Sequence, residues 1–477
     1  MRTTGRGLAW VGILVLGWLC TAWSPALAGK LEDLLLENKQ ITIDQWVQLK
    51  AEEEKREAKV MQESRGVGDV PIRERWYEKI SVRGYTQFRY NYTSGNDLLT
   101  SPGDRSIVKF NEFFLRRARL IVSGQPHDRV FVYLQGEFAG FVSNTNSNNN
   151  NEGTAVLRDA YADVFLTENK EWRIRAGQSK IPFGFETMQS SQNRLAFDRN
   201  DATFAAVPNE RNLGVYLYYA PTVVRERFRR LVESGLKGSG DYGMLGIGVY
   251  NGQAIDQQDA NKNKHVIFHS MYPHEFSNGQ IVQVGMDAYT GQIVVSTSPV
   301  VPTDAIDGIP RLPLVTNGGN YLDERVTWHV VVYPQPFGFQ AEYMIGRTPE
   351  LNADRTAVEL GSVHGGYVQL YYNYKCDTYC QNIFPYVRTQ EYFGGQKLQN
   401  NAPRASARET ELGLEYQFNR ALELTVAYSW TQRTSGDSAT LPVNSLCSSP
   451  TSQAACTQTP YQLQTGNLLR FQLQWSF

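Results

Sequence analysis

The chain has 477 residues and a formal net charge of −1, and 41% of its residues are hydrophobic and 12% are aromatic. No apolar run of roughly 18 residues occurs beyond the extreme N-terminus, which excludes a membrane protein built from several spanning helices. The balanced charge gives no sign of nucleic-acid binding. A soluble globular protein and a β-barrel remain.

Residues 1–28 have the pattern of a secretory signal peptide, and we expect the mature chain to begin directly after them. Two arginines precede an apolar core from Leu8 to Leu19, and the small-residue sequence Ala-Leu-Ala ends at Ala28. Lipidation of Cys20 is the alternative, which the bulky residue before it disfavours.

Residues 29–65 predict a short helical arm, and residues 66–79, with two glycines and a proline, predict a linker. Leucines recur at helical spacing, and residues Thr42 to Asp44 are placed to cap a second helix. The stretch is highly charged and too short for the three or four heptads of a coiled coil. We expect a peripheral arm or a small oligomer-forming bundle, and a tether to another envelope layer is the alternative.

From Ile80 to Phe477, apolar and polar residues alternate between clusters of Gly, Asn, Ser and Asp, which is typical of antiparallel strands. The expected fold class is therefore all-β, and we count sixteen candidate strands. They lie near residues 81–92, 110–122, 129–138, 155–166, 171–178, 212–220, 242–250, 265–272, 281–289, 323–333, 337–346, 364–374, 384–392, 409–418, 421–431 and 464–477.

The connections between these strands alternate in length. Long polar segments such as the Asn-rich residues 143–153 follow odd-numbered strands, whereas tight turns such as residues 167–170 follow most even-numbered ones. Long loops on one rim, short turns on the other and an even strand count are features of a transmembrane β-barrel of the outer membrane. The helical arm would then lie in the periplasm. Residues 221–240 are long where a turn is expected, and a small basic helix or an error in strand register would explain them.

The last strand shows which face meets lipid, because Leu469, Phe471 and Trp475 share one face while Arg470 and Gln472 share the other. An arginine on the lipid face at mid-membrane costs about 2–4 kcal/mol, so we expect the strand face that carries the charged side chains to point into the lumen. The residues assigned to the lumen in this way are Arg83, Arg89, Arg117, Arg119, Arg129, Arg173, Arg175 and Arg470. Isolated charges cannot be buried in a packed core, so the lumen is expected to hold water.

Inward acidic residues are expected on other strands, and they would form an acidic wall opposite the basic one. They are Glu137, Asp159, Asp163, Glu342, Glu411, Glu415 and Glu423. Opposed walls would create a transverse field, and guanidinium groups suit oxyanions such as phosphate, sulfate or carboxylate. A moderate anion preference is therefore our hypothesis. The alternative is that the arginines only pair with inward acids and rigidify the wall.

The segment between the fifth and sixth candidate strands, residues 179–211, is too long and too apolar for a bare surface loop. We expect it to fold into the barrel and narrow it, which would bring Arg194 and Arg199 towards the pathway. An external loop packed on the rim or on a neighbouring subunit is the alternative.

The four cysteines of the mature chain form two close pairs in polar, turn-like sequence, Cys376/Cys380 and Cys447/Cys456. In an exported protein we expect two local disulfides or free thiols. A metal site is the alternative, but the first pair has a three-residue spacer and no neighbouring histidine. We predict no metal and no other cofactor.

Seven stretches of the chain resemble the phosphate-selective porin O/P family. They are EFFLRRARLIVSG at 112–124, YLQGEF at 133–138, LRDAYADVFL at 157–166, RAGQSKIPFGFE at 175–186, NERNLGVYLYY at 209–219, VYNGQ at 249–253 and the terminal strand ending in Phe477. The resemblance is dense from about residue 110 to 253 and thin in the remainder.

This resemblance implies a homotrimeric, sixteen-stranded porin whose third long loop enters the lumen. It also implies that Arg116 and Arg117 take the place of a basic pair that the family keeps near the constriction. The phosphate-binding members use lysines in the inserted loop, whereas this chain offers Lys180 and none after it in that loop.

We therefore predict an outer-membrane porin that lets small hydrophilic solutes diffuse passively, with outer-membrane lipid outside and small anions as permeant solutes. Catalysis is not expected: His265 and His269 would lie about 13 Å apart on one strand face, and no supported nucleophile motif occurs. A structural or adhesive barrel, tethered through the helical arm, is the alternative function.

Overall fold

The computed structural model describes residues 79–95, 111–139, 155–253, 258–297, 317–352, 357–376, 379–436 and 461–477, with residues 42, 45, 46, 255 and 315 in addition. The chain divides into two units, Met1–Arg73 and Glu74–Phe477. The predicted signal peptide (1–28) lies outside the described residues, as do most of the predicted arm (29–65) and linker (66–79).

In the first unit, Thr42 and Gln45 make the reciprocal contacts of a helix N-terminus. The Thr42 amide donates to Gln45 Oε1 at 2.9 Å, and the Gln45 amide donates to Thr42 Oγ1 at 3.3 Å. This is the arrangement of a capping box, in which two side chains satisfy backbone groups at the start of a helix. The capping role proposed for Thr42 fits these contacts, while the helical arm as a whole stays a prediction.

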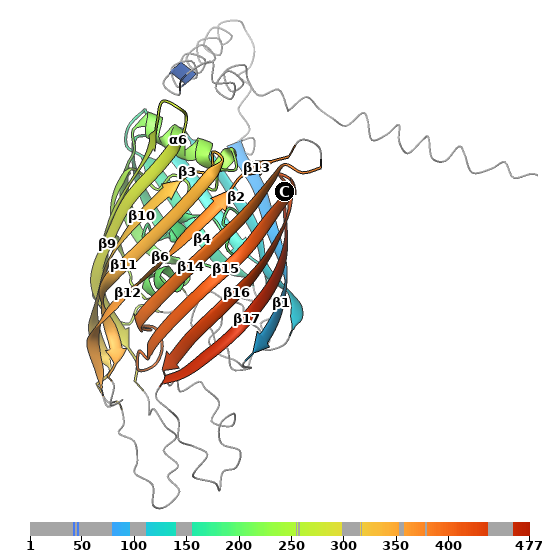
Figure 1. The fold of residues 1–477 in the computed structure, drawn as a ribbon. Helices are drawn as coiled ribbons and strands as arrows, with labels where there is room; N and C mark the ends of the chain where they lie inside the picture. Colours follow the sequence, from blue (N-terminus) through green and yellow to red (C-terminus); the bar gives the residue numbers. More distant parts are fainter. Residues whose placement is uncertain are drawn as a thin grey trace, which may run out of the picture. The chain divides into compact units, whose positions relative to one another are not determined.

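The second unit is built almost entirely from strands (Figure 1). They are β1 (Ile80–Gly95), β2 (Glu112–His127), β3 (Val130–Glu137), β4 (Val156–Phe165), β5 (Trp172–Lys180), β6 (Arg211–Tyr219), β7 (Leu245–Tyr250), β8 (His265–Glu275), β9 (Ile281–Val295), β10 (Gly319–Val332), β11 (Phe337–Leu351), β12 (Val358–Tyr372), β13 (Tyr374–Lys375), β14 (Asn382–Gly395), β15 (Arg404–Asn419), β16 (Leu422–Gly436) and β17 (Tyr461–Ser476).

These strands close into a single antiparallel barrel. Each strand pairs with its neighbours in the chain, and β1 also pairs with β17, with Phe88 opposite Leu473. The two-residue β13 continues β12 after Asn373, and both pair with β14, so they fill one position in the wall. The predicted sixteen-stranded antiparallel barrel is confirmed.

Alternation along each strand sorts the side chains between the two faces of the wall. On β17, Phe471 and Trp475 are each 38% exposed, whereas Arg470 and Gln474 are buried inside. Large exposed apolar side chains recur on the outer face of the other long strands, among them Phe88 and Trp430. The apolar exterior and polar interior are those of a barrel that crosses a membrane.

The wall has a short part and a tall part. Strands β3 to β8 are 6 to 11 residues long. Leaving β13 aside, the other strands are 14 to 16 residues long. Because about 9 to 11 residues suffice for a strand to cross the hydrocarbon, the tall part extends beyond it.

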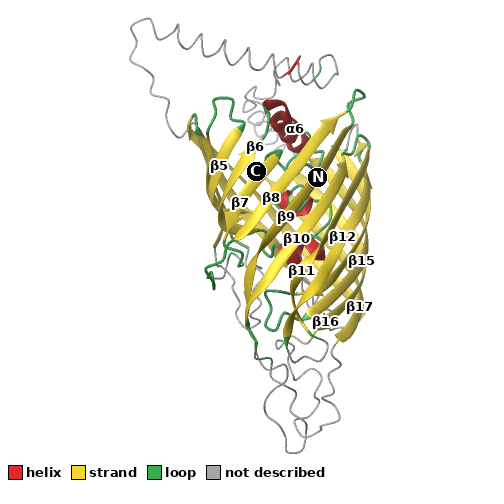
Figure 2. Ribbon diagram, turned by 90° about the vertical axis from the view of Figure 1, so that its left-hand side faces the viewer, coloured by secondary structure: helices red, strands yellow, loops and turns green. Residues whose placement is uncertain are grey.

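Three helices accompany the barrel: α4 (Phe185–Met188), α5 (Asp201–Ala206) and α6 (Thr222–Glu233). In Figure 2, α4 and α5 lie within the outline of the barrel and α6 lies at one end of it. Among the described residues, none of the helices is long and apolar enough to span a membrane. Helix α6 accounts for the unexpectedly long connection at residues 221–240, so no register error is needed there.

Candidate functional site

Residues 181–210, which connect β5 and β6, form a loop that fills much of the barrel interior; we call it the inserted loop. Ser191 fastens it to the first two strands. Its Oγ lies 2.7 Å from Tyr85 Oη and accepts a hydrogen bond from Arg119 at 3.1 Å, and its carbonyl accepts one from Gln87 at 3.1 Å. The loop therefore folds inward, as the sequence predicted, and does not pack outside the rim.

Farther along the inserted loop, Asp198 gathers three guanidinium groups of the barrel wall. It lies 2.8 Å from Arg470 on β17, 3.3 Å from Arg89 on β1 and 3.7 Å from Arg116 on β2. Burial alone would raise the pKa of Asp198, but these guanidiniums hold it well below its usual range. One carboxylate therefore contacts three cations.

The opposite side of the lumen holds the loop through Glu186 on α4. Arg388 on β14 donates two hydrogen bonds to its carboxylate, at 2.5 and 3.0 Å, and the Asn200 side chain donates a third at 2.8 Å. Burial would raise the pKa of Glu186, and Arg388 reverses this and lowers it. Next to it, Glu342 on β11 accepts from the Thr203 hydroxyl at 2.8 Å.

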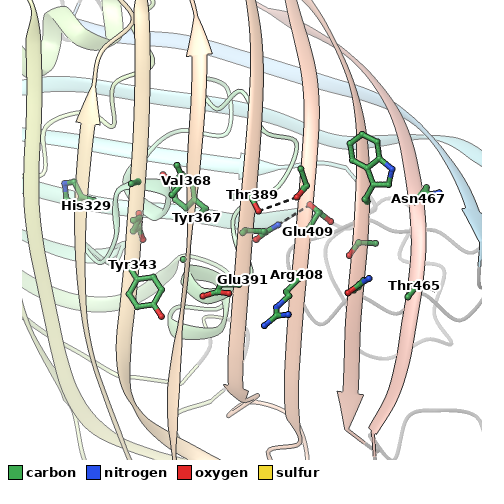
Figure 3. Close-up of a pocket in the computed structure, with 18 of the residues that line it drawn as sticks. His329, Tyr343, Tyr367, Val368, Thr389, Glu391, Arg408, Glu409, Thr465 and Asn467 are labelled. Carbon is green, nitrogen blue, oxygen red and sulfur yellow. Dashed lines mark hydrogen bonds between the residues drawn. The ribbon is translucent and has the colours of Figure 1, made fainter.

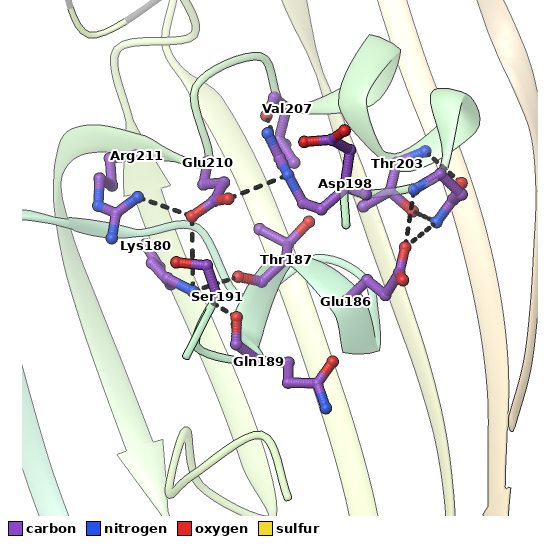
Figure 4. Close-up of polar contacts among 12 residues, drawn as sticks. Lys180, Glu186, Thr187, Gln189, Ser191, Asp198, Thr203, Val207, Glu210 and Arg211 are labelled. Carbon is purple, nitrogen blue, oxygen red and sulfur yellow. Dashed lines mark hydrogen bonds and ion pairs between the residues drawn. The ribbon is translucent and has the colours of Figure 1, made fainter. Parts of the chain in front are cut away.

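The end of the inserted loop returns to β6 through a tight ionic cluster, which Figure 4 shows around Glu210. The Glu210 carboxylate lies 2.6 Å from Arg211, 3.0 Å from Arg199 and 3.5 Å from Lys180. Lys180 also donates to the carbonyls of Thr187 and Gln189, at 2.8 and 2.7 Å. Lys180 and Arg199 are thus brought together by one carboxylate that the sequence analysis did not single out.

Most of the predicted inward arginines are buried in ion pairs. Arg119 lies 2.6 Å from Glu137, and Arg175 lies 2.7 Å from Asp163. Arg173 contacts Asp163 at 3.5 Å and Asp241 at 2.8 Å. Arg117 donates to Gln87 at 2.7 Å. Water alone does not solvate these groups, because acids on neighbouring strands and the inserted loop cover them.

The expectation of an acidic wall opposite the basic one is wrong for three residues. Glu137, Asp159 and Asp163 lie on β3 and β4, beside the arginines of β2, β5 and β6, and they pair with them directly. Adjacent strands place cross-strand neighbours about 5 Å apart, which favours pairing over separation. Glu342 and Glu415 do lie on the other side of the lumen, where they contact the inserted loop and Lys237.

Two further arginines differ from expectation. Arg129 is not in the lumen: it is an exposed residue of the two-residue turn between β2 and β3, 3.5 Å from Glu168. Arg83 has the inward parity of Gln87 and Arg89, but it is exposed near the rim where β1 begins. Both corrections arise because side chains near a strand end reach solvent, whichever face of the wall the alternation assigns them to.

Two β-bulges change which arginines point inward. On β2, Leu115 pairs with Phe88 and Arg117 with Gln87, so Arg116 is an extra residue, and it is buried in the lumen beside Asp198. On β4 the same happens at Arg158, between Leu157 and Asp159. The sequence analysis missed Arg158, although its signal was present: two adjacent charges at 158 and 159 cannot both face inward on a regular strand.

Arg158 and Arg194 stand apart from the other lumen cations. Among the described residues, neither guanidinium makes a hydrogen bond or an ion pair, and all three side-chain nitrogens of Arg194 are buried. Both groups are close enough to Glu210 to interact with it electrostatically. Both guanidiniums can therefore donate hydrogen bonds to a passing or bound anion.

The cysteine predictions divide between described and undescribed residues. Cys376 and Cys380 form a disulfide in the turn between β13 and β14, with Cα atoms 5.3 Å apart. Cys447 and Cys456 lie outside the described residues. In the part of the chain that the structure describes, no three His, Cys, Asp or Glu side chains are grouped to hold a metal ion.

One hollow of the described surface lies on the outer wall. It has a volume of about 760 Å³ and is lined from β10 to β17 (Figure 3). Its exposed side chains, among them Trp328, Tyr343, Glu391 and Arg408, point away from the lumen. This hollow is therefore not the channel.

Comparison with solved structures finds outer-membrane porins and channels of low sequence identity. OmpF of Salmonella typhi is 13% identical with a TM-score of 0.48, and the match covers 83% of this chain and 97% of that one. The outer membrane channel DcaP of Acinetobacter baumannii has the same identity and coverages, with a TM-score of 0.47. An anion-selective porin from Comamonas acidovorans is 9% identical with a TM-score of 0.44, and the match covers 83% of this chain and 99% of that one.

No curated protein matches the sequence. A family model does: that of phosphate-selective porin O and P matches residues 88–463, which is most of the chain. The matched range spans nearly the whole barrel, including the inserted loop and the ion pairs described above other than those of Arg470. The chain therefore belongs to the phosphate-selective porin O and P family and is an outer-membrane porin channel.

Proposed function

We propose that this porin passes small anions in preference to cations, and that Arg158 and Arg194 supply the preference. The observation that carries the proposal is that these two guanidiniums have no acidic partner among the described residues, whereas most other lumen arginines do. A paired arginine contributes little to the electric field in the lumen, since the negative charge of its carboxylate partner cancels its positive charge at a distance. An unpaired one attracts anions and can donate several hydrogen bonds to them.

The cluster around Asp198 supports the same sign of selectivity. Arg89, Arg116 and Arg470 share that one carboxylate, and Arg470 has Glu411 as its second partner. In the part of the chain that the structure describes, these three guanidiniums contact two carboxylates. The first, second and last strands thus gather cations on one side of the lumen.

The permeant class we propose is small oxyanions, with phosphate as one member. The family description names phosphate, and planar guanidinium groups bind the oxygens of phosphate, sulfate and carboxylate alike. The inserted loop of this chain contains Arg194 and Arg199 but no lysine. We therefore expect a preference for oxyanions as a class, with little distinction between phosphate and sulfate.

We also propose that three barrels assemble into a homotrimer, that residues 1–28 are removed on export, and that residues 29–65 form the periplasmic arm. The family membership and the chain's alternation of long loops and short turns support this arrangement. Cross-linking in outer-membrane fragments, with and without residues 29–65, would measure the subunit number and the contribution of the arm.

Reversal potentials in planar bilayers test the anion preference. A double variant, Arg158→Gln with Arg194→Gln, should lower the chloride-to-potassium permeability ratio, and phosphate should block the chloride current less. The matched control is Arg347→Gln, because Arg347 lies on the outer face and pairs with Glu324 there. An unchanged ratio in the double variant, with the control also unchanged, would remove the proposal.

A further inference from the structure

A second segment enters the barrel from the opposite rim. Residues 220–244, which we call the strap, connect β6 to β7 at the rim where the chain's short turns lie. The turns between β2 and β3 and between β15 and β16 on the same rim consist of two residues each, 128–129 and 420–421. The strap is therefore far longer than the connection needs.

Helix α6 forms the first half of the strap and turns an apolar face towards the lumen. Val224, Phe228 and Leu231 are buried, at the i, i+4, i+7 spacing of one helix face. Phe228 packs with Met271 of β8, and Leu231 packs with residues at the rim ends of β9 and β10. Arg230, on the same helix, lies 2.8 Å from Glu275 at the end of β8.

The second half of the strap crosses to the far wall. Lys237 is buried, lies 2.5 Å from Glu415 on β15 and sits over the ring of Phe384 on β14. With β12 and β13 counted as one position, β15 is the seventh strand after β7 and the eighth before β6. In a sixteen-position barrel this is the opposite side, so the chain spans the mouth.

The strap then returns to the wall from which it started. Asp241 accepts two hydrogen bonds from Arg173 on β5, at 2.8 and 3.0 Å, and the Tyr242 ring lies 5.6 Å from the Arg175 guanidinium. The guanidinium groups of Arg173, on the wall, and Arg225, on α6, lower the pKa of Asp241 to about 2 against the effect of its burial. Both ends of the crossing are thus fixed by charge.

The strap and the inserted loop touch inside the barrel. The Gln189 side chain donates to the Lys237 carbonyl at 2.7 Å, Met188 packs with Val224 and Phe228, and Phe185 packs with Leu231. A solute leaving the inserted loop towards this rim therefore meets the strap next.

We propose that the strap is a second constriction, in series with the inserted loop, and that the Lys237–Glu415 ion pair holds it across the mouth. In this arrangement the strap limits the size of the solutes that pass, while the unpaired arginines set their charge. The inference rests on the channel function and does not depend on the anion preference. Its residues are paired cations and acids, so the strap has no strong charge preference of its own.

Two variants release the strap in different ways. Lys237→Gln removes the charge that binds Glu415, and Leu231→Asp places a carboxylate on the buried face of α6, where no cation lies opposite it in the apolar cluster. The matched control is Arg229→Gln, because Arg229 is 46% exposed on the outer face of α6 and pairs with Glu226 and Glu233 along the helix. Heat-modifiable mobility in gels shows which variants still fold as barrels.

Single-channel conductance and liposome swelling with sugars of increasing mass provide the measurement. Both releasing variants should raise unit conductance and admit sugars that the unchanged protein excludes, with uptake several-fold faster, while Arg229→Gln should match the unchanged protein. The chloride-to-potassium ratio should stay the same. Folded Lys237→Gln and Leu231→Asp barrels with unchanged conductance and size limit would overturn the proposal. If the variants are wider and the unchanged protein itself shows no anion preference, the strap proposal stands and the anion preference is removed.

Discussion

The inserted loop and the strap both occupy the lumen, but different forces hold them. Buried charges fix the loop to strands on every side: Asp198 to β1, β2 and β17, Asp201 to β16 and Glu186 to β14. The strap relies on the apolar face of α6 and on one crossing ion pair, Lys237–Glu415. Directional charge pairs define one position for the loop, whereas apolar packing tolerates sliding.

This difference suggests separate tasks for the two segments. The loop must keep its guanidinium groups at fixed distances from a permeating ion, which many ion pairs ensure. The strap needs only to narrow the channel, and it can still narrow the channel when its position shifts. Changes in the loop should therefore alter stability and selectivity, and changes in the strap should alter passage alone.

The largest effect, a loss of stability, is expected from Glu186→Gln, which breaks the ion pair between the inserted loop and Arg388. Removing one partner of a buried ion pair costs about 3–5 kcal/mol, because the other charge stays buried without compensation. Thermal unfolding followed by heat-modifiable gel mobility should show a clear drop in midpoint. The outward pair offers the control: Glu324→Gln should leave the midpoint nearly unchanged, and equal drops would contradict the comparison.

A smaller effect, on selectivity, is expected from Asp198→Asn. The change removes the carboxylate shared by Arg89, Arg116 and Arg470, so the net charge of that side of the lumen rises. The chloride-to-potassium permeability ratio should increase if the barrel still folds. A ratio that falls or stays level would mean that these three arginines lie away from the ion pathway.

Acid should release the two segments only at low pH. The folded pKa of Asp198, Glu186 and Glu210 lies below the ordinary value in each case, and that of Asp241 falls from 3.8 to about 2. Their stabilisation is therefore complete above about pH 4.5 and is lost as the pH falls through the lower folded values. Conductance should stay constant from pH 7 to pH 5 and change below pH 4. In Asp241→Asn the contribution of the strap to that acid transition should be missing.

The smallest effect is expected at the surface of α6. Arg229 pairs with Glu226 at 2.7 Å and with Glu233 at 2.5 Å, but all three side chains are partly exposed. Such pairs contribute about 0.2–1 kcal/mol at most. Arg229→Gln should leave unfolding midpoint and conductance within error, and a large loss would show that the outer face of α6 has a partner.

The barrel could be predicted from the sequence because its determinants are local. Alternation on β17 from Leu469 to Trp475 repeats in strand after strand, and each strand pairs with its neighbour in the chain. The number of strands followed from this pattern, and the inward direction of the loop followed from its length and apolar composition. The path of the strap across the mouth could not be predicted, because Glu415 lies 178 residues from Lys237 and no sequence pattern links the two.

The site was harder to predict than the fold. The alternation along a strand places Arg119 and Arg175 on the inner face, but it does not identify the acidic residues that neutralise them. Acids that pair with these arginines were therefore assigned to an opposite wall. The two bulges at Arg116 and Arg158 also reverse parity, and a bulge depends on how two strands pair and not on one of them. The unpaired arginines are visible only after every pair is known.

The outward-facing Glu391 and Arg408 determine how deeply the barrel can be immersed. They lie opposite each other on β14 and β15, each four residues from the loop-side end of its strand. Sinking a charge of this kind to the middle of the hydrocarbon costs about 2–4 kcal/mol for a cation. The lipid surface must therefore end below them. On this side the long strands extend beyond the bilayer surface. The shorter strands on the opposite side of the barrel can end level with that surface.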